Sequence, residues 1–108
     1  MKKIYYLKTC DTCRRVLKEM DTSDFILQEI KMEPITVKQL DELFSLTKSY
    51  EVLFSRMAKK YKQMGLKSQQ LTENDYRQFI LDEYTFLKRP VIIIGSEVYV
   101  GNTKKRVT

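Results

Sequence analysis

The chain contains two cysteines, and both lie in the short segment Cys10-Asp11-Thr12-Cys13. An apolar run predicts a β-strand over residues 3–7, and a helix is expected over residues 11–20. A thiol at a helix N-terminus faces unpaired backbone N–H groups and the positive end of the helix dipole, and both favour the thiolate. We therefore predict a redox-active pair. Cys10 is the expected nucleophile, and Cys13, nearly one turn further along, is expected to resolve a mixed disulfide.

The rest of the sequence limits how this pair is activated. The chain has no histidine, so Ser-His-Asp and Cys-His arrangements are excluded, and positive charge must come from side chains such as Lys8, Arg14 and Arg15. Two other interpretations stay open. A C-x-x-C pair is half of a zinc site, although a site here would need carboxylate ligands, and no metal is expected. Alternatively, both cysteines are buried small hydrophobic residues without redox chemistry.

Length and composition favour one domain over residues 1–108. The apolar run after the basic start ends at Leu7, which is too short for a signal peptide. No segment approaches the ~20 apolar residues that a membrane span requires, so no membrane contact is expected. The expected location is cytoplasmic, a reducing compartment where a lone C-x-x-C is more often catalytic than structural.

Positive charge exceeds negative charge, with a formal net charge of +6 at pH 7. Basic residues recur in two runs, which are Lys59, Lys60, Lys62 and Lys67, and then Lys104, Lys105 and Arg106. Solvated helix faces explain such runs, and so does an anionic substrate or an acidic partner surface. No nucleic-acid-binding motif accompanies the charge, so direct contact with nucleic acid is not expected.

The elements along the chain predict an α/β fold. Strands over residues 3–7 and 25–30 enclose the helix of residues 11–20, which is a βαβ unit with parallel strands. Two further helices begin at capping boxes, and a helical insertion covers about residues 48–84. The capping boxes pair Thr36 with Gln39 and Thr72 with Asp75. A β-hairpin follows, because the apolar run of residues 91–94 precedes Gly95-Ser96 and a second strand over residues 97–100.

This order of elements, with a cysteine between the first strand and helix and a proline before the third strand, resembles a thioredoxin-like fold. More specifically, the chain resembles the arsenate reductase (ArsC)/Spx family over nearly its full length. The matching segments are residues 10–15, 31–36, 53–56, 61–66 and 87–92. The resemblance implies a four-stranded mixed sheet with flanking helices and a helical insertion before the C-terminal β-hairpin.

The resemblance also implies roles for individual residues. Cys10 matches the nucleophilic cysteine, and Pro90 matches the cis-proline of thioredoxin-like folds. Arg89 matches an arginine that holds the oxyanion and stabilises the thiolate, and Arg56 falls where a second such arginine lies. Arg14, within the cysteine motif, is a further candidate for substrate binding. A guanidinium suits a tetrahedral oxyanion because its planar fork donates two parallel hydrogen bonds.

The chain departs from the family's pattern in two places that concern chemistry. Arsenate reductases of this type carry a third arginine shortly after the last strand, and the matching place here is about Gly101. Many family enzymes also lack the second cysteine and use glutathione to resolve the intermediate, whereas Cys13 is available here. The oxyanion pocket is therefore expected to be incomplete, with resolution inside the chain.

Two functions of different classes follow. The first is a thiol-dependent oxidoreductase that acts on an arsenate-like oxyanion or a disulfide, with no bound cofactor. Its electron donor would be thioredoxin or glutathione, through the thioredoxin or glutaredoxin system. The alternative is a Spx-like regulator that binds RNA polymerase and uses Cys10 and Cys13 as a redox switch. The C-x-x-C is typical of Spx, but the glycine that Spx proteins carry before the central arginine is missing from residues 47–51.

Overall fold

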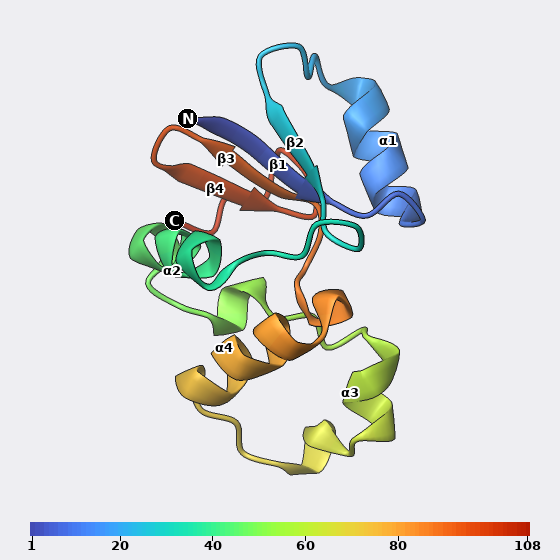
Figure 1. Ribbon diagram of the computed structural model, residues 1–108, viewed down its shortest axis with the longest axis vertical. Coiled ribbons are helices and arrows are strands. Elements are labelled where there is room, and N and C mark those ends of the chain that lie inside the picture. The colour runs from blue at the N-terminus through green and yellow to red at the C-terminus, as the bar shows by residue number, and fades with distance from the viewer.

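The computed structural model describes residues 1–108 as a four-stranded mixed sheet with helices on both faces (Figure 1). The strand order is β2-β1-β3-β4, in which β1 is parallel to β2 and β3 is antiparallel to both of its neighbours. The elements, with the short 3-10 helices marked η, are β1 (Lys2–Tyr6), α1 (Asp11–Glu19), β2 (Ile26–Glu29), α2 (Val37–Thr47), η1 (Glu51–Leu53), α3 (Lys59–Gln63), η2 (Leu66–Ser68), α4 (Glu73–Asp82), η3 (Tyr84–Phe86), β3 (Val91–Ile94) and β4 (Glu97–Val100). The predicted thioredoxin-like α/β fold is confirmed. None of the helices is long and apolar enough to cross a membrane.

The βαβ unit forms as predicted, with slightly shorter elements. In the sheet register, Ile4 of β1 lies beside Leu27 of β2. β1 ends at Tyr6 because the chain turns at once, and the Leu7 carbonyl accepts a hydrogen bond from the Cys10 N–H at 3.1 Å. This turn places Cys10 directly before the first residue of α1.

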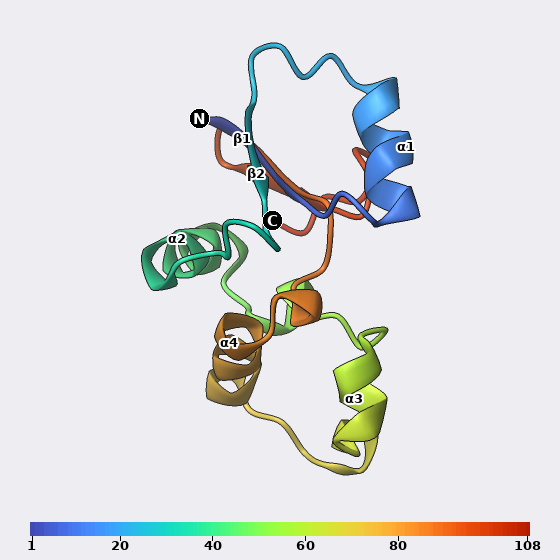
Figure 2. The same ribbon diagram turned by 45° about the vertical axis from the view of Figure 1, so that its right-hand side comes forward.

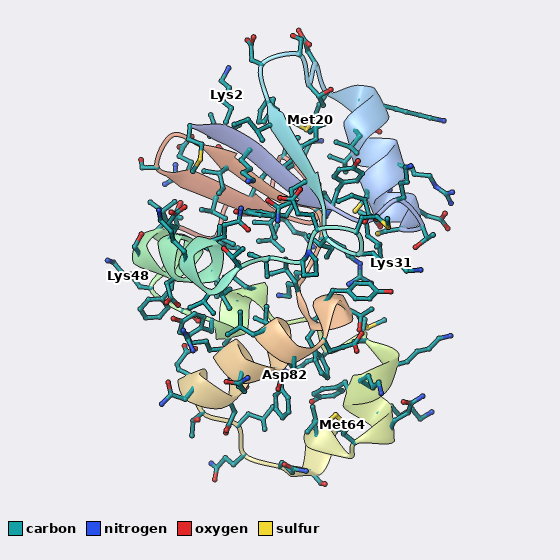
Figure 3. All side chains as sticks on the ribbon, viewed as in Figure 1. Lys2, Met20, Lys31, Lys48, Met64 and Asp82 are labelled. Atoms are coloured by element: carbon teal, nitrogen blue, oxygen red, sulfur yellow. The ribbon has the colours of Figure 1, made fainter.

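Alternate residues of β1 pack against different layers. Ile4 forms a small cluster with Val16 of α1, and Met20 at the end of that helix packs against it (Figure 3). Tyr5 belongs instead to the larger core cluster, which also contains Leu40 of α2. Helix α1 therefore covers one face of the sheet and α2 lies against the other, an arrangement that Figure 2 shows from the side.

The hairpin of β3 and β4 matches its sequence pattern. β3 pairs with a strand on each side, and its residues Val91 to Ile93 are buried. Gly95 adopts a left-handed φ of 63° in the turn to β4, a conformation that costs glycine little because it has no Cβ. An uninterrupted apolar run is what a central strand covered on both faces requires.

The helical segment between α2 and β3 is held together by Phe54, which is completely buried. Its ring stacks on Phe86, with the ring centroids 5.0 Å apart. Two backbone hydrogen bonds of 2.7 Å join the same two stretches of chain, because the Ser55 N–H donates to the Phe86 carbonyl and the Lys88 N–H donates to the Leu53 carbonyl. Residues 53–56 therefore run alongside residues 86–89, directly before β3.

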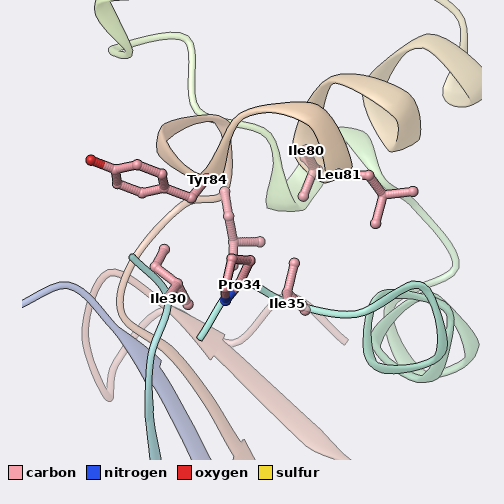
Figure 4. A pocket seen from close by; sticks show the side chains of 7 residues that line it. Ile30, Pro34, Ile35, Ile80, Leu81 and Tyr84 are labelled. Carbon is pink, nitrogen blue, oxygen red and sulfur yellow. The ribbon is translucent and has the colours of Figure 1, made fainter. Parts of the chain in front are cut away.

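A small apolar gap lies where this segment meets the loop after β2 (Figure 4). Ile30, Pro34 and Ile35 line it on the β2 side, and Ile80, Leu81, Tyr84 and Leu87 line it on the α4 side. Its volume of about 10 Å³ is at most that of one water molecule. It is a packing gap rather than a ligand site.

Both predicted capping boxes are present, and the first one also connects α2 to the sheet. The Gln39 side-chain oxygen accepts a hydrogen bond from the Thr36 N–H at 3.1 Å, which completes the box. Gln39 also exchanges two side-chain hydrogen bonds, of 2.8 and 3.0 Å, with Gln28 of β2. Gln28 is only 2% exposed, so this amide pair satisfies polar atoms that water does not reach.

Replacing Gln39 with alanine should lower the free energy of unfolding by about 2 kcal/mol, because it leaves the buried Gln28 amide without this partner. Thr36→Ala is the matched control, since it removes the helix cap but keeps the amide pair, and it should cost about 1 kcal/mol. Urea unfolding followed by circular dichroism measures both values. Equal losses would show that the amide pair does not stabilise the protein beyond the cap.

Candidate active site

Cys10 is the N-cap residue of α1 and has an extended backbone, with φ −87° and ψ 119°. Its carbonyl accepts a hydrogen bond from the Arg14 N–H at 3.0 Å, the first such bond of the helix. The thiol therefore lies at the positive end of the helix dipole. This is the position that the sequence predicted.

The pKa of Cys10 lies below its ordinary value. Burial of this half-buried thiol acts in the opposite direction and raises the pKa. Hydrogen bonds from the backbone N–H and the thiol of Cys13 outweigh burial, with help from the Arg89 positive charge and the Thr12 N–H. Each of these groups stabilises the thiolate relative to the thiol.

The pKa of Cys13 shifts in the opposite direction, and the Cys13 side chain is completely buried. Burial raises its pKa to about 12. The hydrogen bond with the Leu7 backbone is the largest contribution that opposes this increase, the hydrogen bond to Cys10 and the negative charge there act in the same direction as burial, and Arg89 opposes burial more weakly. Of the two thiols, Cys10 therefore ionises more readily, and Cys13 keeps its proton to higher pH. Both cysteines are free in this structure.

Arg89 and Pro90 lie directly before β3. The Arg89–Pro90 peptide bond is cis, which confirms the prediction for this bond. One terminal nitrogen of the Arg89 guanidinium donates to the carbonyls of Thr85 at 3.0 Å and Leu87 at 3.1 Å. The Arg89 Nε is buried and has no hydrogen-bond partner. Arg89 is thus fixed beside both cysteines with a donor that is still unused.

Cys10 and Arg89 line the same cavity, which has a volume of about 360 Å³. The ten lining residues are Cys10, Thr12, Ser55, Met57, Lys88, Arg89, Val100, Gly101, Lys105 and Val107. Pro90 forms part of its support, since the Pro90 carbonyl accepts a hydrogen bond from the Gly101 N–H at 2.9 Å. The cavity is therefore built where α1, the start of β3 and the end of β4 meet.

The other two predicted arginines do not line this cavity. Arg14 is exposed and pairs with Asp11 on the surface of α1. Arg56 donates to the Glu51 carboxylate at 2.8 Å and to the Tyr76 hydroxyl at 3.0 Å. The hydrogen bond to Glu51 raises the pKa of Arg56. Gly101 stands where the family's third arginine would be, so Arg89 supplies the one guanidinium of the cavity.

Lys88 and Lys105 also line the cavity, although the sequence did not indicate them as site residues. Lys88 precedes Arg89, and the sequence pointed to it only as a member of the matching segment 87–92. Lys105 belongs to the basic run near the C-terminus, and its place depends on how the chain folds after β4. The Val100 N–H donates to the Lys105 carbonyl at 3.1 Å, and the Val107 N–H donates to the Val98 carbonyl at 2.8 Å, which returns this segment to the edge of β4.

No group of three or more His, Cys, Asp or Glu side chains is arranged so that it could hold a metal ion. The side chains at the site that can act chemically are two thiols and the cations beside them. A low-pKa thiolate on an open cavity, with a second thiol behind it and a cation beside it, can attack an electrophilic sulfur or oxyanion centre.

The two cysteines lie at the start of α1, and β3 follows a cis-proline in the mixed sheet. These features define a dithiol protein with a thioredoxin-like fold. Residues 5–108 match the ArsC family. Because this match covers nearly the whole chain, the protein belongs to the ArsC family.

Similar proteins include both of the types that the sequence resembled. The global transcriptional regulator Spx of Lactiplantibacillus plantarum is 23% identical over 107 residues, which are 96% of this chain and 81% of that protein. The crystal structure of a protein related to the ArsC family from Bacteroides fragilis has a TM-score of 0.78 at 20% identity, over 92% of this chain and 87% of that one. Arsenate reductase from Vibrio cholerae has a TM-score of 0.71 at 18% identity, over 90% and 86% of the two chains. At these identities the structural likeness shows the fold.

Proposed function

We propose that this protein is a thiol-dependent oxidoreductase in which Cys10 is the nucleophile and Cys13 the resolving cysteine. The observation that carries the proposal is the placement of the two thiols, with Cys10 at the N-terminus of α1 on the open cavity and Cys13 completely buried in the first turn of that helix. Cys10 has the low pKa and lies on the cavity, whereas Cys13 has the high pKa and is completely buried. A nucleophile must be ionised and accessible, and a resolving thiol must be held beside it, which fits this division.

The cycle on a disulfide substrate has two steps. The Cys10 thiolate attacks one substrate sulfur, a new S–S bond forms, and the other substrate sulfur leaves as a thiolate that takes a proton from water. Cys13 then loses its proton and attacks the Cys10 sulfur, which releases the second product thiol and leaves the Cys10–Cys13 disulfide. The dithiol gives up two electrons, and the substrate gains them. With an arsenate-like oxyanion, the Cys10 sulfur would instead bond to the central atom while one oxygen leaves as water. Cys13 would then attack the Cys10 sulfur, so that the sulfur–central atom bond breaks and the central atom leaves with its two electrons.

The proposal includes thioredoxin or glutathione as the electron donor, with no bound cofactor. The donor would have to attack the sulfur of Cys10, because Cys13 is 0% exposed and Cys10 is on the open cavity. Such a cycle needs a reducing compartment, so we place the protein in the cytoplasm.

An assay of NADPH consumption tests this function. Wild-type protein is supplied with arsenate or with a low-molecular-weight disulfide, and one arm contains thioredoxin with its reductase while the other contains glutathione, glutaredoxin and glutathione reductase. We expect turnover in at least one arm, and Cys10→Ser should reduce it to the background rate. A wild-type rate equal to that of Cys10→Ser with every substrate and donor would contradict the proposal.

A redox-controlled regulator of RNA polymerase is the second candidate function. The match to Spx over 96% of this chain favours it, and so does the glycine at position 101 in place of an oxyanion-binding arginine. Immobilised protein, with Cys10 and Cys13 either reduced or oxidised, would be incubated with purified RNA polymerase. Retention that depends on the redox state of the pair would support this candidate, and no retention in either state would exclude it.

A further inference from the structure

The cavity that contains Cys10 has a strongly unbalanced charge. Lys88, Arg89 and Lys105 line it, and no aspartate or glutamate does. Neither lysine takes part in an ion pair, because the five ion pairs of the protein all involve other residues. Uncompensated cations that share one concave space repel each other, so an anion that enters it is stabilised.

The surroundings of Lys88 also contain more positive than negative charge. Burial lowers the pKa of Lys88, and the positive charges of Arg56 and Lys105 lower it further, while Glu51 acts weakly in the opposite direction. The Lys88 backbone is fixed, since its N–H donates to the Leu53 carbonyl at 2.7 Å. Lys88 is therefore a partly buried cation with a fixed backbone and no ion-pair partner.

The cavity is also too large and too apolar to be built for a small oxyanion alone. Its volume of about 360 Å³ lies in the range of pockets that hold organic ligands. Met57, Val100 and Val107 contribute apolar side chains to its wall. Ammonium groups bind carboxylates as point charges, without the fork geometry that a tetrahedral oxyanion favours. This combination of charge, volume and apolar surface fits a carbon skeleton that bears carboxylates.

We propose that Lys88 and Lys105 bind the carboxylates of an organic disulfide while Cys10 attacks its sulfur. This inference rests on the proposed dithiol chemistry. In the first step the Cys10 thiolate forms a bond to one substrate sulfur, and the substrate S–S bond breaks. The departing carboxylate-bearing thiolate takes a proton from water. Cys13 then attacks the Cys10 sulfur, so that the Cys10–substrate S–S bond breaks, the Cys10–Cys13 disulfide forms and the Cys13 proton goes to the departing second thiolate. Two electrons pass in this way from the cysteine pair to the substrate.

Two chromogenic disulfides separate charge recognition from thiol reactivity. Dithiobis(nitrobenzoate) carries two carboxylates, and dithiodipyridine is neutral. The rate of Cys10 modification by each is measured in a Cys13→Ser background at low and high salt. Lys88→Gln and Lys105→Gln should each slow the carboxylate probe about three- to fivefold and leave the neutral probe unchanged, since a partly exposed ionic contact is worth about that factor. High salt should reduce the difference.

Lys104→Gln is the matched control, because Lys104 is the exposed neighbour of Lys105 and does not line the cavity. It should leave both rates unchanged. Equal slowing of both probes by Lys88→Gln would show that this lysine acts on the thiol itself, and no slowing by either lysine variant would show that neither binds the substrate. Both results overturn the inference. Failure of the proposed function looks different, because Cys10 would then react with both probes no faster than a free thiol.

Discussion

Replacing Cys13 with serine should stop the reaction with dithiobis(nitrobenzoate) after its first step and leave one thionitrobenzoate on Cys10. Cys13 is the other cysteine of the chain, so the variant has no thiol that can displace the adduct. A correctly placed thiol has an effective concentration far above that of any thiol in solution. Without added thiol, release of the second product should therefore slow more than about a hundredfold. Mass spectrometry of the intact protein detects the adduct.

Wild-type protein and Cys10→Ser are the two controls for this experiment. Oxidised wild-type protein should carry no adduct, should have lost two hydrogens, and should remain a monomer on a non-reducing gel. Cys10→Ser should react slowly, because Cys13 is completely buried and burial raises its pKa to about 12. Fast modification of Cys10→Ser would reverse the roles of the two cysteines. Dimers as the main wild-type product would contradict the pairing within one chain.

The sequence predicted the part of the site that depends on local structure. The strand before Cys10 and the helix that begins after it are determined mainly by interactions between residues close in sequence, and the structure has both elements. The two capping boxes and the turn at Gly95 are equally local, because each depends on side chains or backbone freedom within about four residues. The cis bond before Pro90 was expected from the resemblance to a family, not from the local sequence.

The remaining features depend on contacts between distant segments. Arg56 and Glu51 are five residues apart, and nothing in their sequence shows that they bond to each other and to Tyr76. Lys105 reaches the cavity because the chain after β4 folds back along that strand through hydrogen bonds to Val98 and Val100. The basic run before Gly65 does form a helix, but α3 is only five residues long. Gly65, with φ 65°, follows it in the left-handed region.

Replacing Arg89 with alanine should shift the reactivity of Cys10 to higher pH. The positive charge of Arg89 lowers the pKa of Cys10, although it is a smaller contribution than burial or the hydrogen bonds from Cys13. Removing this charge raises the pKa, so a smaller fraction of Cys10 is thiolate at neutral pH. Alkylation by iodoacetamide reports this fraction, since only the thiolate reacts. In a Cys13→Ser background, the midpoint of rate against pH should move upward in Arg89→Ala and return toward the original value in Arg89→Lys.

The same variants separate the charge of Arg89 from its hydrogen bonds. Arg89→Lys keeps the charge but loses the planar guanidinium, whose Nε is buried without a partner and whose terminal nitrogen bonds the carbonyls of Thr85 and Leu87. Reaction with the carboxylate-bearing probe should therefore fall about tenfold in Arg89→Ala, and Arg89→Lys should restore it less completely than it restores the pKa. Thermal unfolding of each variant checks that the fold is intact.

Arg15→Ala is the matched control for the Arg89 experiment, because Arg15 is an exposed cation of α1 that does not line the cavity. Its alkylation profile should coincide with that of the parent protein. If the profile of Arg89→Ala also coincides with it, then Arg89 serves only to hold the segment before β3 through its two carbonyl contacts. The lowered pKa of Cys10 would then come from Cys13, Thr12 and the start of α1. A shift in Arg89→Ala that Arg89→Lys reverses can come only from the charge, because the lysine does not rebuild the guanidinium's hydrogen bonds.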